Sequence, residues 1–219
     1  MSGRQLSGTT PAPPPPPAAA TICGNALDAV VEYAGLLARD GVASGLIGPR
    51  EVPRLWERHL LNCAVVVPAV PPGALVLDIG SGAGLPGLVW ALARPDLRVV
   101  LVEPLLRRTQ FLTAALQHLG LTAVSVERVR AEDLRGRYTA DVVTARAVAP
   151  LSRLLGWTLP LLRPGGRLLA FKGRSAAEEI TAASDTLCTA GTSALLSTYG
   201  EGVLDPPTTV VEVSRSDHS

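Results

Sequence analysis

The stretch Val76-Leu77-Asp78-Ile79-Gly80-Ser81-Gly82-Ala83-Gly84-Leu85-Pro86-Gly87 joins an apolar run to a cluster of glycines. A short apolar run that ends in glycines predicts a buried strand followed by a tight turn. Glycine suits such a turn because positive φ angles and close approach to a ligand both disfavour a Cβ atom. Open α/β sheets bind ligands at the carboxyl ends of their strands, so this turn is the predicted binding site.

Two classes of cofactor use a turn of this kind. The glycines match G-x-G-x-x-G, the fingerprint of dinucleotide-binding proteins, at Gly82, Gly84 and Gly87. Asp78 adds the Asp-x-Gly-x-Gly-x-Gly pattern of class I methyltransferases, in which it would order the turn or reach a methionyl ammonium group. Leu85-Pro86 crowds the helix start, where a pyrophosphate would need open N–H groups. The pattern therefore favours S-adenosyl-L-methionine over a nicotinamide cofactor.

Glu103 ends the next predicted strand, roughly 20 positions beyond the glycine turn, which is the spacing of an acid that accepts hydrogen bonds from a ribose. Both cofactor classes carry a ribose, so Glu103 does not distinguish them. The alternative is a solvated carboxylate at a strand end.

Strand-like and helical segments alternate after the turn. The expected strands are 74–79, 99–102, 123–126, 141–144, 167–172, 193–199 and 208–213. The expected helices are 88–93, 107–119, 151–162 and 175–189. Apolar strands between helices predict an α/β fold with a mostly parallel, doubly wound, Rossmann-like sheet, as in class I S-adenosylmethionine-dependent methyltransferases.

The N-terminal third differs from this pattern and divides the chain into three predicted parts. Residues 1–20 are rich in Pro, Ala, Ser and Thr and predict a disordered tail. Residues 21–70 predict a small helical cap, with one helix from Asn25, a turn at Gly48-Pro49 and a second helix from Glu51. Residues 71–219 form the predicted methyltransferase domain.

Composition limits the class of protein. The formal net charge of +1 neither supports nor excludes an RNA partner, because basic residues can cluster on one face. Cys23, Cys63 and Cys188 are odd in number and lack C-x-x-C spacing, so no disulfide framework and no zinc or other metal site is expected. Neither a membrane span nor a signal peptide is predicted. We expect a cytoplasmic monomer.

Further motifs follow one another in a recognisable order. They are RHLLN at 58–62, RRTQFL at 107–112, RAE at 130–132, ARA at 145–147 and FKG at 171–173. Together with DIGSGAGLPG at 78–87, they resemble the ribosomal RNA small subunit methyltransferase G family, also called glucose-inhibited division protein B. The resemblance covers roughly residues 25–213. It implies transfer of a methyl group to N7 of one guanine in the 16S rRNA of the small ribosomal subunit.

The resemblance also implies roles for individual residues. Ala131 and Glu132 would contact the adenine, and Arg146 would lie near the methionine end and the target base. The predicted cofactor site is Asp78, Gly80, Gly82, Gly84, Leu85, Glu103, Ala131, Glu132 and Arg146. Arg146 and Lys172, each at the end of a predicted strand, are the predicted catalytic residues, which would orient the base rather than move a proton. The alternative for Arg146 is a structural ion pair with Asp78 or Glu103.

Basic residues on several elements predict an RNA-binding surface that neutralises phosphates. They are Arg58, His59, Arg107, Arg108, Arg130, Lys172 and Arg174. For any single member, a solvated surface charge is the alternative. Trp56, Trp90 and Trp157 could stack a base, although their helical surroundings favour core packing.

Two other functions remain open from the residues alone. One is a methyltransferase for a small molecule or a protein, which would usually need a base to deprotonate its acceptor. The other is a non-catalytic RNA-binding relative, which the complete glycine turn disfavours. The Asn-Pro-Pro-Tyr motif of amino-group methyltransferases is missing from the sequence.

Overall fold

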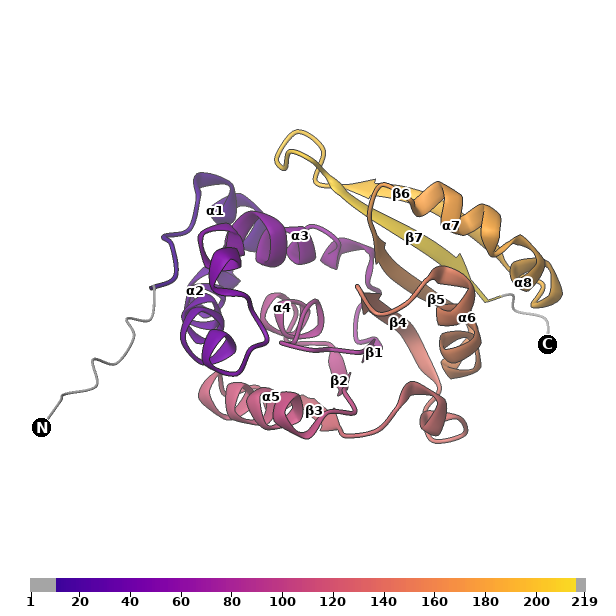
Figure 1. The fold of residues 1–219 in the computed structure, drawn as a ribbon, viewed down its shortest axis with the longest axis horizontal. Helices are drawn as coiled ribbons and strands as arrows, with labels where there is room; N and C mark the ends of the chain where they lie inside the picture. Colours follow the sequence, from indigo (N-terminus) through magenta and orange to yellow (C-terminus); the bar gives the residue numbers. More distant parts are fainter. Residues whose placement is uncertain (1–10, 216–219) are drawn as a thin grey trace, which may run out of the picture.

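A seven-stranded sheet forms the centre of the protein in a computed structural model that describes residues 11–215 (Figure 1). Its strands are β1 (Leu75–Ile79), β2 (Arg98–Val102), β3 (Val124–Glu127), β4 (Ala140–Arg146), β5 (Leu162–Lys172), β6 (Ser193–Tyr199) and β7 (Thr208–Ser214). They lie in the order β3-β2-β1-β4-β5-β7-β6. The first five are parallel to one another, and β7 runs antiparallel to both β5 and β6. The predicted mostly parallel sheet is confirmed.

Helices precede the sheet and connect its strands. The α-helices are α1 (Pro17–Cys23), α2 (Leu27–Leu36), α3 (Leu61–Ala64), α4 (Gly87–Ala93), α5 (Leu106–His118), α6 (Leu151–Thr158), α7 (Ala176–Ala182) and α8 (Ser184–Thr189). Short 3-10 or π-helical turns are η1 (Gly24–Ala26), η2 (Leu37–Gly41), η3 (Pro49–Arg54), η4 (Trp56–Leu60), η5 (Val67–Ala69), η6 (Ala131–Leu134) and η7 (Leu159–Leu161). Within residues 11–215, none of the helices is long and apolar enough to cross a membrane.

Each face of the sheet is covered by its own set of helices. Successive side chains of a strand point to opposite faces. Val76 and Val142 therefore pack into one core with α4, α5 and the N-terminal elements. Leu77 and Val143 pack into a second core with α6, α7 and α8. Figure 1 shows the same division, with α1 to α5 on one side of the sheet and α6 to α8 on the other. Burial on both faces explains why these strands are continuous apolar runs.

The N-terminal segment corrects one prediction. Residues 1–10 of the predicted tail lie outside the described residues, but disorder is wrong for the stretch that follows. Pro17 begins α1, Ala19 is fully buried, and Trp56 Nε1 donates a hydrogen bond to the carbonyl of Pro13 at 2.9 Å. Proline at the first helical position has a suitable φ, and the alanines after it favour a helix. This segment and α4 pack into the same core. The domain boundary near residue 70 stays a prediction from the sequence.

Two element boundaries differ from expectation. The expected helix at 151–162 ends at Thr158, and β5 begins at Leu162 rather than Arg167. A bulge between the pairs Ala140–Leu162 and Val142–Arg167 admits the turn sequence Pro164-Gly165-Gly166 into the strand. In the cap, the second expected helix is a succession of η3, η4 and α3.

The tryptophans serve mainly in packing. Trp90 is fully buried and donates from Nε1 to the carbonyl of Cys63 at 3.0 Å. Trp56 is also buried, while Trp157 is half-buried, with the Arg153 guanidinium 5.8 Å from its ring centre. Core packing, the favoured interpretation, is confirmed for Trp56 and Trp90.

Candidate cofactor site

The glycine turn follows β1 at the carboxyl edge of the sheet. Its glycines have left-handed backbone angles, with φ of +67° at Gly80, +57° at Gly82 and +95° at Gly84. The N–H groups of Gly80 and Ser81 donate to the carbonyl of Val102 at 2.8 and 3.1 Å, which ties the turn to β2. Ser81 Oγ donates to the carbonyl of Asp78 at 2.7 Å. Hydrogen bonds within the chain therefore shape the turn.

Gly82 and Gly84 differ in their surroundings. A Cβ atom on Gly84 would collide with Leu88 and lie 3.0 Å from the hydroxyl of Tyr33. A Cβ atom on Gly82 would meet only the carbonyl oxygen of Gly80, at 3.8 Å. Gly84 is thus required by packing inside the protein, whereas Gly82 borders open space that a ligand can fill.

Tyr33 connects the cap to the turn. It lies on α2, is fully buried, and its hydroxyl donates to the carbonyl of Ala83 at 2.6 Å. Burial raises the pKa of this phenol well above its ordinary value. Tyr33 was missed as a site residue in the sequence, although a tyrosine on the apolar stripe of a helix signals a buried hydroxyl that needs a partner.

Asp78 lies beneath the turn and is fully buried. Its Oδ2 accepts the N–H of Gly87 at 3.0 Å, at the start of α4. Among the described residues, its Oδ1 is the one buried side-chain oxygen or nitrogen without a hydrogen-bond partner. Burial raises the pKa of Asp78 to about 7, although the hydrogen bond from Gly87, the nearby hydroxyl of Ser81 and the charge of Arg146 oppose that rise. This orphaned oxygen is a ready acceptor for a cationic or N–H-bearing group.

The raised pKa of Asp78 predicts a loss of stability with increasing pH. Its pKa is about 7 in the folded chain against the ordinary 3.8, so the folded state holds more protons between these values. The free energy of unfolding of the cofactor-free protein should therefore fall from pH 4 to pH 7, by up to about 1.4 kcal/mol per pH unit from this group. Urea unfolding at each pH measures it. Asp78→Asn, which keeps an acceptor for Gly87, should lack this component, and identical slopes for variant and parent would contradict the assignment.

Glu103 follows β2 and is almost fully buried. Its Oε2 accepts the N–H of Gly82 at 3.1 Å and its Oε1 that of Leu105 at 3.1 Å. Arg108 Nη1 lies 3.4 Å from Oε2. The solvated carboxylate considered as an alternative does not describe this residue. Glu103 braces the glycine turn, and a ribose hydroxyl would join or replace these partners.

Arg146 ends β4 and points to the face of the sheet that the cap covers. Because Ile79 pairs with Ala145, Arg146 lies beside the glycine turn. Its Nη2 donates to the carbonyl of Arg58 at 3.0 Å and to His59 Nδ1 at 2.7 Å, and its Nη1 donates to Cys63 Sγ at 3.4 Å. None of these partners is a carboxylate, so the alternative of an ion pair with Asp78 or Glu103 is not what holds it.

His59 must be neutral to accept this bond. Arginine stays protonated, so Nδ1 of His59 supplies a lone pair and Nε2 carries the proton. Nε2 lies 3.1 Å from Glu51 Oε2, which accepts that proton's hydrogen bond. Burial and then the Arg146 charge lower the pKa of His59, which favours the neutral form.

Lys172 does not join Arg146. Arg146 pairs with Phe171, which packs against Trp90 in the core that contains the N-terminal elements. Lys172 is the next residue along β5, so its side chain points to the opposite face of the sheet. There Lys172 Nζ lies 2.7 Å from Glu179 Oε2 on α7. The two predicted catalytic residues are therefore on neighbouring strands but on different faces. The sequence shows that each ends a strand, whereas the relative orientation depends on the pairing register.

The remaining predicted residues are spread along the carboxyl edge. Ala131 is buried and Glu132 exposed at η6, and Leu85 is buried at the end of the glycine turn. Among the basic residues, Arg58 is paired with Glu51 at 3.2 Å and Arg107 donates to the carbonyl of Ala43 at 3.1 Å. Arg130 and Arg174 have exposed side chains. No group of three or more His, Cys, Asp or Glu residues that could hold a metal occurs in the described chain.

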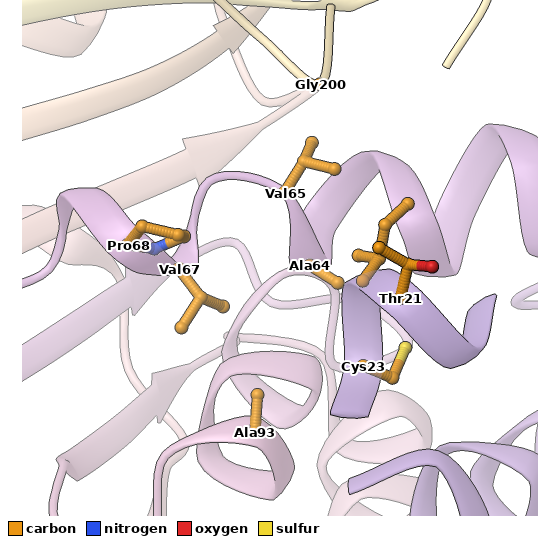
Figure 2. Close-up of a pocket in the computed structure, with 9 residues that line it drawn as sticks. Thr21, Cys23, Ala64, Val65, Val67, Pro68, Ala93 and Gly200 are labelled. Atoms are coloured by element: carbon orange, nitrogen blue, oxygen red, sulfur yellow. The ribbon is translucent and has the colours of Figure 1, made fainter. Parts of the chain in front are cut away.

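A separate pocket of about 340 Å³ lies between α1, α3, the end of α4 and the turn after β6 (Figure 2). It is lined by Thr21, Ile22, Cys23, Ala64, Val65, Val67, Pro68, Ala93 and Gly200. Ala93 ends α4, whereas the glycine turn adjoins the start of that helix. This mostly apolar pocket is therefore distinct from the turn.

The fold and this site define a class I S-adenosylmethionine-dependent methyltransferase. The residues present fit the cofactor: open space borders Gly82, an orphaned carboxylate oxygen lies below the turn, and an acid follows β2. The chain belongs to the rRNA small subunit methyltransferase G family, whose family model matches residues 26–200.

Individual comparisons agree with this assignment. A ribosomal RNA small subunit methyltransferase G from Salinispora tropica is 55% identical over 94% of this chain and 88% of its own length. One from Thermobifida fusca is 57% identical over 87% of this chain and 81% of its own. Among solved structures, a precorrin-6y C5,15-methyltransferase from Geobacter metallireducens matches 78% of this chain and 91% of its own, with 15% identity and a TM-score of 0.52. This similarity shows that the two proteins share a fold.

Proposed function

We propose that this chain transfers a methyl group from S-adenosyl-L-methionine to N7 of guanine 527 in the 16S rRNA of the small ribosomal subunit. The names of its relatives support rRNA as the substrate class. The observation that carries the chemistry is the guanidinium of Arg146, which three contacts hold beside the glycine turn. The monomeric state and the cytoplasmic location stay predictions.

Guanine N7 suits this site because it needs no base. Its lone pair lies in the ring plane and carries no proton at neutral pH. The cofactor supplies an electrophilic methyl group on a sulfonium. The protein has to exclude water and align the acceptor, and positioning of this kind can supply roughly 7–11 kcal/mol of the barrier. Arg146 stays protonated, so its part is to hold the base or a flanking phosphate.

The side chains around Arg146 support this assignment. Both ring nitrogens of His59 are engaged, Nδ1 with Arg146 and Nε2 with Glu51, so neither is available to remove a proton from an acceptor. For the other contacts, we propose the roles that the family implies. Ala131 and Glu132 at η6 contact the adenine, and Glu103 holds the ribose.

The substrate can be tested by mapping methylated guanines. Small subunits from cells that lack this gene are incubated with the protein and cofactor, and N7-methylguanine is located by borohydride reduction and aniline cleavage. We expect one new cleavage site, at guanine 527. Cleavage at other positions, or methyl transfer to protein alone, would overturn the assignment.

The proposed RNA face predicts a dependence on salt. Arg107, Arg130 and Arg174 are exposed at the carboxyl edge. Changing Arg130 and Arg174 together to Ala should weaken binding to small-subunit rRNA and reduce the log–log salt slope by about 0.7–0.9 per lost phosphate contact. Filter binding between low and moderate salt measures both.

Arg98→Ala is the matched control for this experiment. Arg98 is exposed like the two tested residues, but it begins β2 and so lies at the opposite edge of the sheet. Its slope should equal that of the parent. A double variant with an unchanged slope would place Arg130 and Arg174 outside the interface. Arg108 is unsuitable here because it contacts Glu103.

A further inference from the structure

Lys172 is already bound on the face of the sheet that α7 covers. Only 8% of its side chain is exposed. Its Nζ donates to Glu179 Oε2 at 2.7 Å and to the carbonyl of Ala149 at 2.8 Å. A lysine with two such partners and little exposure is poorly placed to neutralise an RNA phosphate, so its position calls for another role.

Glu179 completes the arrangement from α7. Its Oε2 also accepts the N–H of Leu151 at 2.8 Å. The ion pair therefore binds the carbonyl before Pro150 and the N–H after it, and proline itself has no N–H to offer. Burial alone would raise the pKa of Glu179, but the hydrogen bonds from Lys172 and Leu151 outweigh it and lower that pKa. The two peptide groups that flank Pro150 are thus attached to one ionised pair.

The loop of residues 147–150, which ends at this attachment, lies over the glycine turn. It follows Arg146 and begins at Ala147, whose φ of +56° is the one left-handed angle of a non-glycine residue among the described residues. Such an angle persists only where surrounding contacts impose it. Val148 comes next, and its Cγ2 would lie 2.7 Å from a Cβ atom on Gly80. Val148 therefore contacts the turn directly, from the loop that the ion pair holds.

We propose that Lys172 and Glu179 are positioning residues that hold the loop of residues 147–150 over the glycine turn. They act on cofactor binding through Val148 and not on RNA through a phosphate contact. The inference rests on the proposed cofactor site but not on the identity of the RNA. Glu179 had no role in the predictions from the sequence, and the proposal gives it the same function as Lys172.

The test compares two readouts in the full-length protein. Lys172→Met and Glu179→Gln should each weaken S-adenosyl-L-methionine binding by about tenfold, a typical coupling between residues in one network. The double variant should lose no more than either single variant. In calorimetry, Glu178→Gln is the control, because Glu178 is an exposed neighbour on the same helix. In the two single variants, the double variant and the control, the slope of log rRNA affinity against log salt concentration should equal that of the parent.

Two results would overturn the proposal. One is a smaller salt slope in Lys172→Met alone, which would place Lys172 on a phosphate. The other is parental cofactor affinity in both single variants. Glu179→Gln keeps an acceptor for Leu151, so the fold should survive, and hydrogen exchange at the Leu151 amide reports whether the loop has loosened. If a Gly82→Val variant also binds the cofactor with parental affinity, the proposed cofactor site is wrong. If Gly82→Val weakens binding but the Lys172 and Glu179 variants do not, only the role of the Lys172–Glu179 pair is wrong.

Discussion

Gly82→Val should weaken cofactor binding by about 100-fold in a protein that still folds. A Cβ atom at this position meets only the Gly80 carbonyl oxygen, at 3.8 Å, so the fold has room for it. The valine methyl groups would then occupy the space that we assign to the cofactor. Overpacking typically costs about 1–3 kcal/mol, and two methyl groups inside the cofactor's space should reach the upper end of that range, so we expect affinity to fall by about 100-fold. Isothermal titration calorimetry with S-adenosyl-L-methionine measures the loss.

Gly84→Ala supplies the contrasting variant. Its Cβ atom would collide with Leu88 and crowd the hydroxyl of Tyr33, at a φ of +95°. It should therefore lower the free energy of unfolding, whereas Gly82→Val should lower it only by the roughly 1–2 kcal/mol of a left-handed residue. Thermal unfolding separates the two effects. Normal cofactor affinity in folded Gly82→Val would remove this turn from the binding site.

Arg146→Lys should slow methyl transfer by about 100-fold at saturating cofactor, the loss expected when a positioning group shifts by about 1 Å. The guanidinium binds Arg58, His59 and Cys63 at once, and a single ammonium cannot reproduce that planar geometry. Single-turnover methylation of small subunits measures the rate. Arg167→Lys is a matched control, because Arg167 also joins a strand to the cap, through the carbonyl of Ala69 at 2.8 Å, but near the start of β5.

At saturating cofactor, the same assay should give a rate that is flat from about pH 6.5 to pH 9, because guanine N7 has no proton to lose and a positive group of the cofactor beside Oδ1 would hold Asp78 ionised. Below that range the rate should fall, because protonated His59 would present an N–H to the Arg146 guanidinium and lose its 2.7 Å bond. The lowered pKa of His59 keeps this loss below neutral pH. A tenfold rise per pH unit across the neutral range would instead show that the acceptor must lose a proton, with the buried carboxyl of Asp78 as the candidate base.

The sequence alone determined the fold class and the position of the glycine turn, to which we assign the cofactor. Both depend on short-range patterns: apolar runs bounded by glycines identify β1 and its turn, and alternation with amphipathic helices identifies a parallel sheet. Asp78, Gly82 and Glu103 could be predicted as site residues because each lies at a set distance from the end of a strand. The tail was misjudged at Pro17–Ala20, because a proline that usually breaks a helix can also begin one.

Only the tertiary structure decided which side chains act together. Arg146 and Lys172 both end strands, yet the register between β4 and β5 places them on opposite faces, one beneath the cap and one against α7. Likewise, the contacts from Tyr33 to Ala83 and from Glu179 to Leu151 join residues far apart in the chain. Such contacts depend on how whole elements pack, and no periodicity within a single segment specifies which face of a sheet a distant helix will cover.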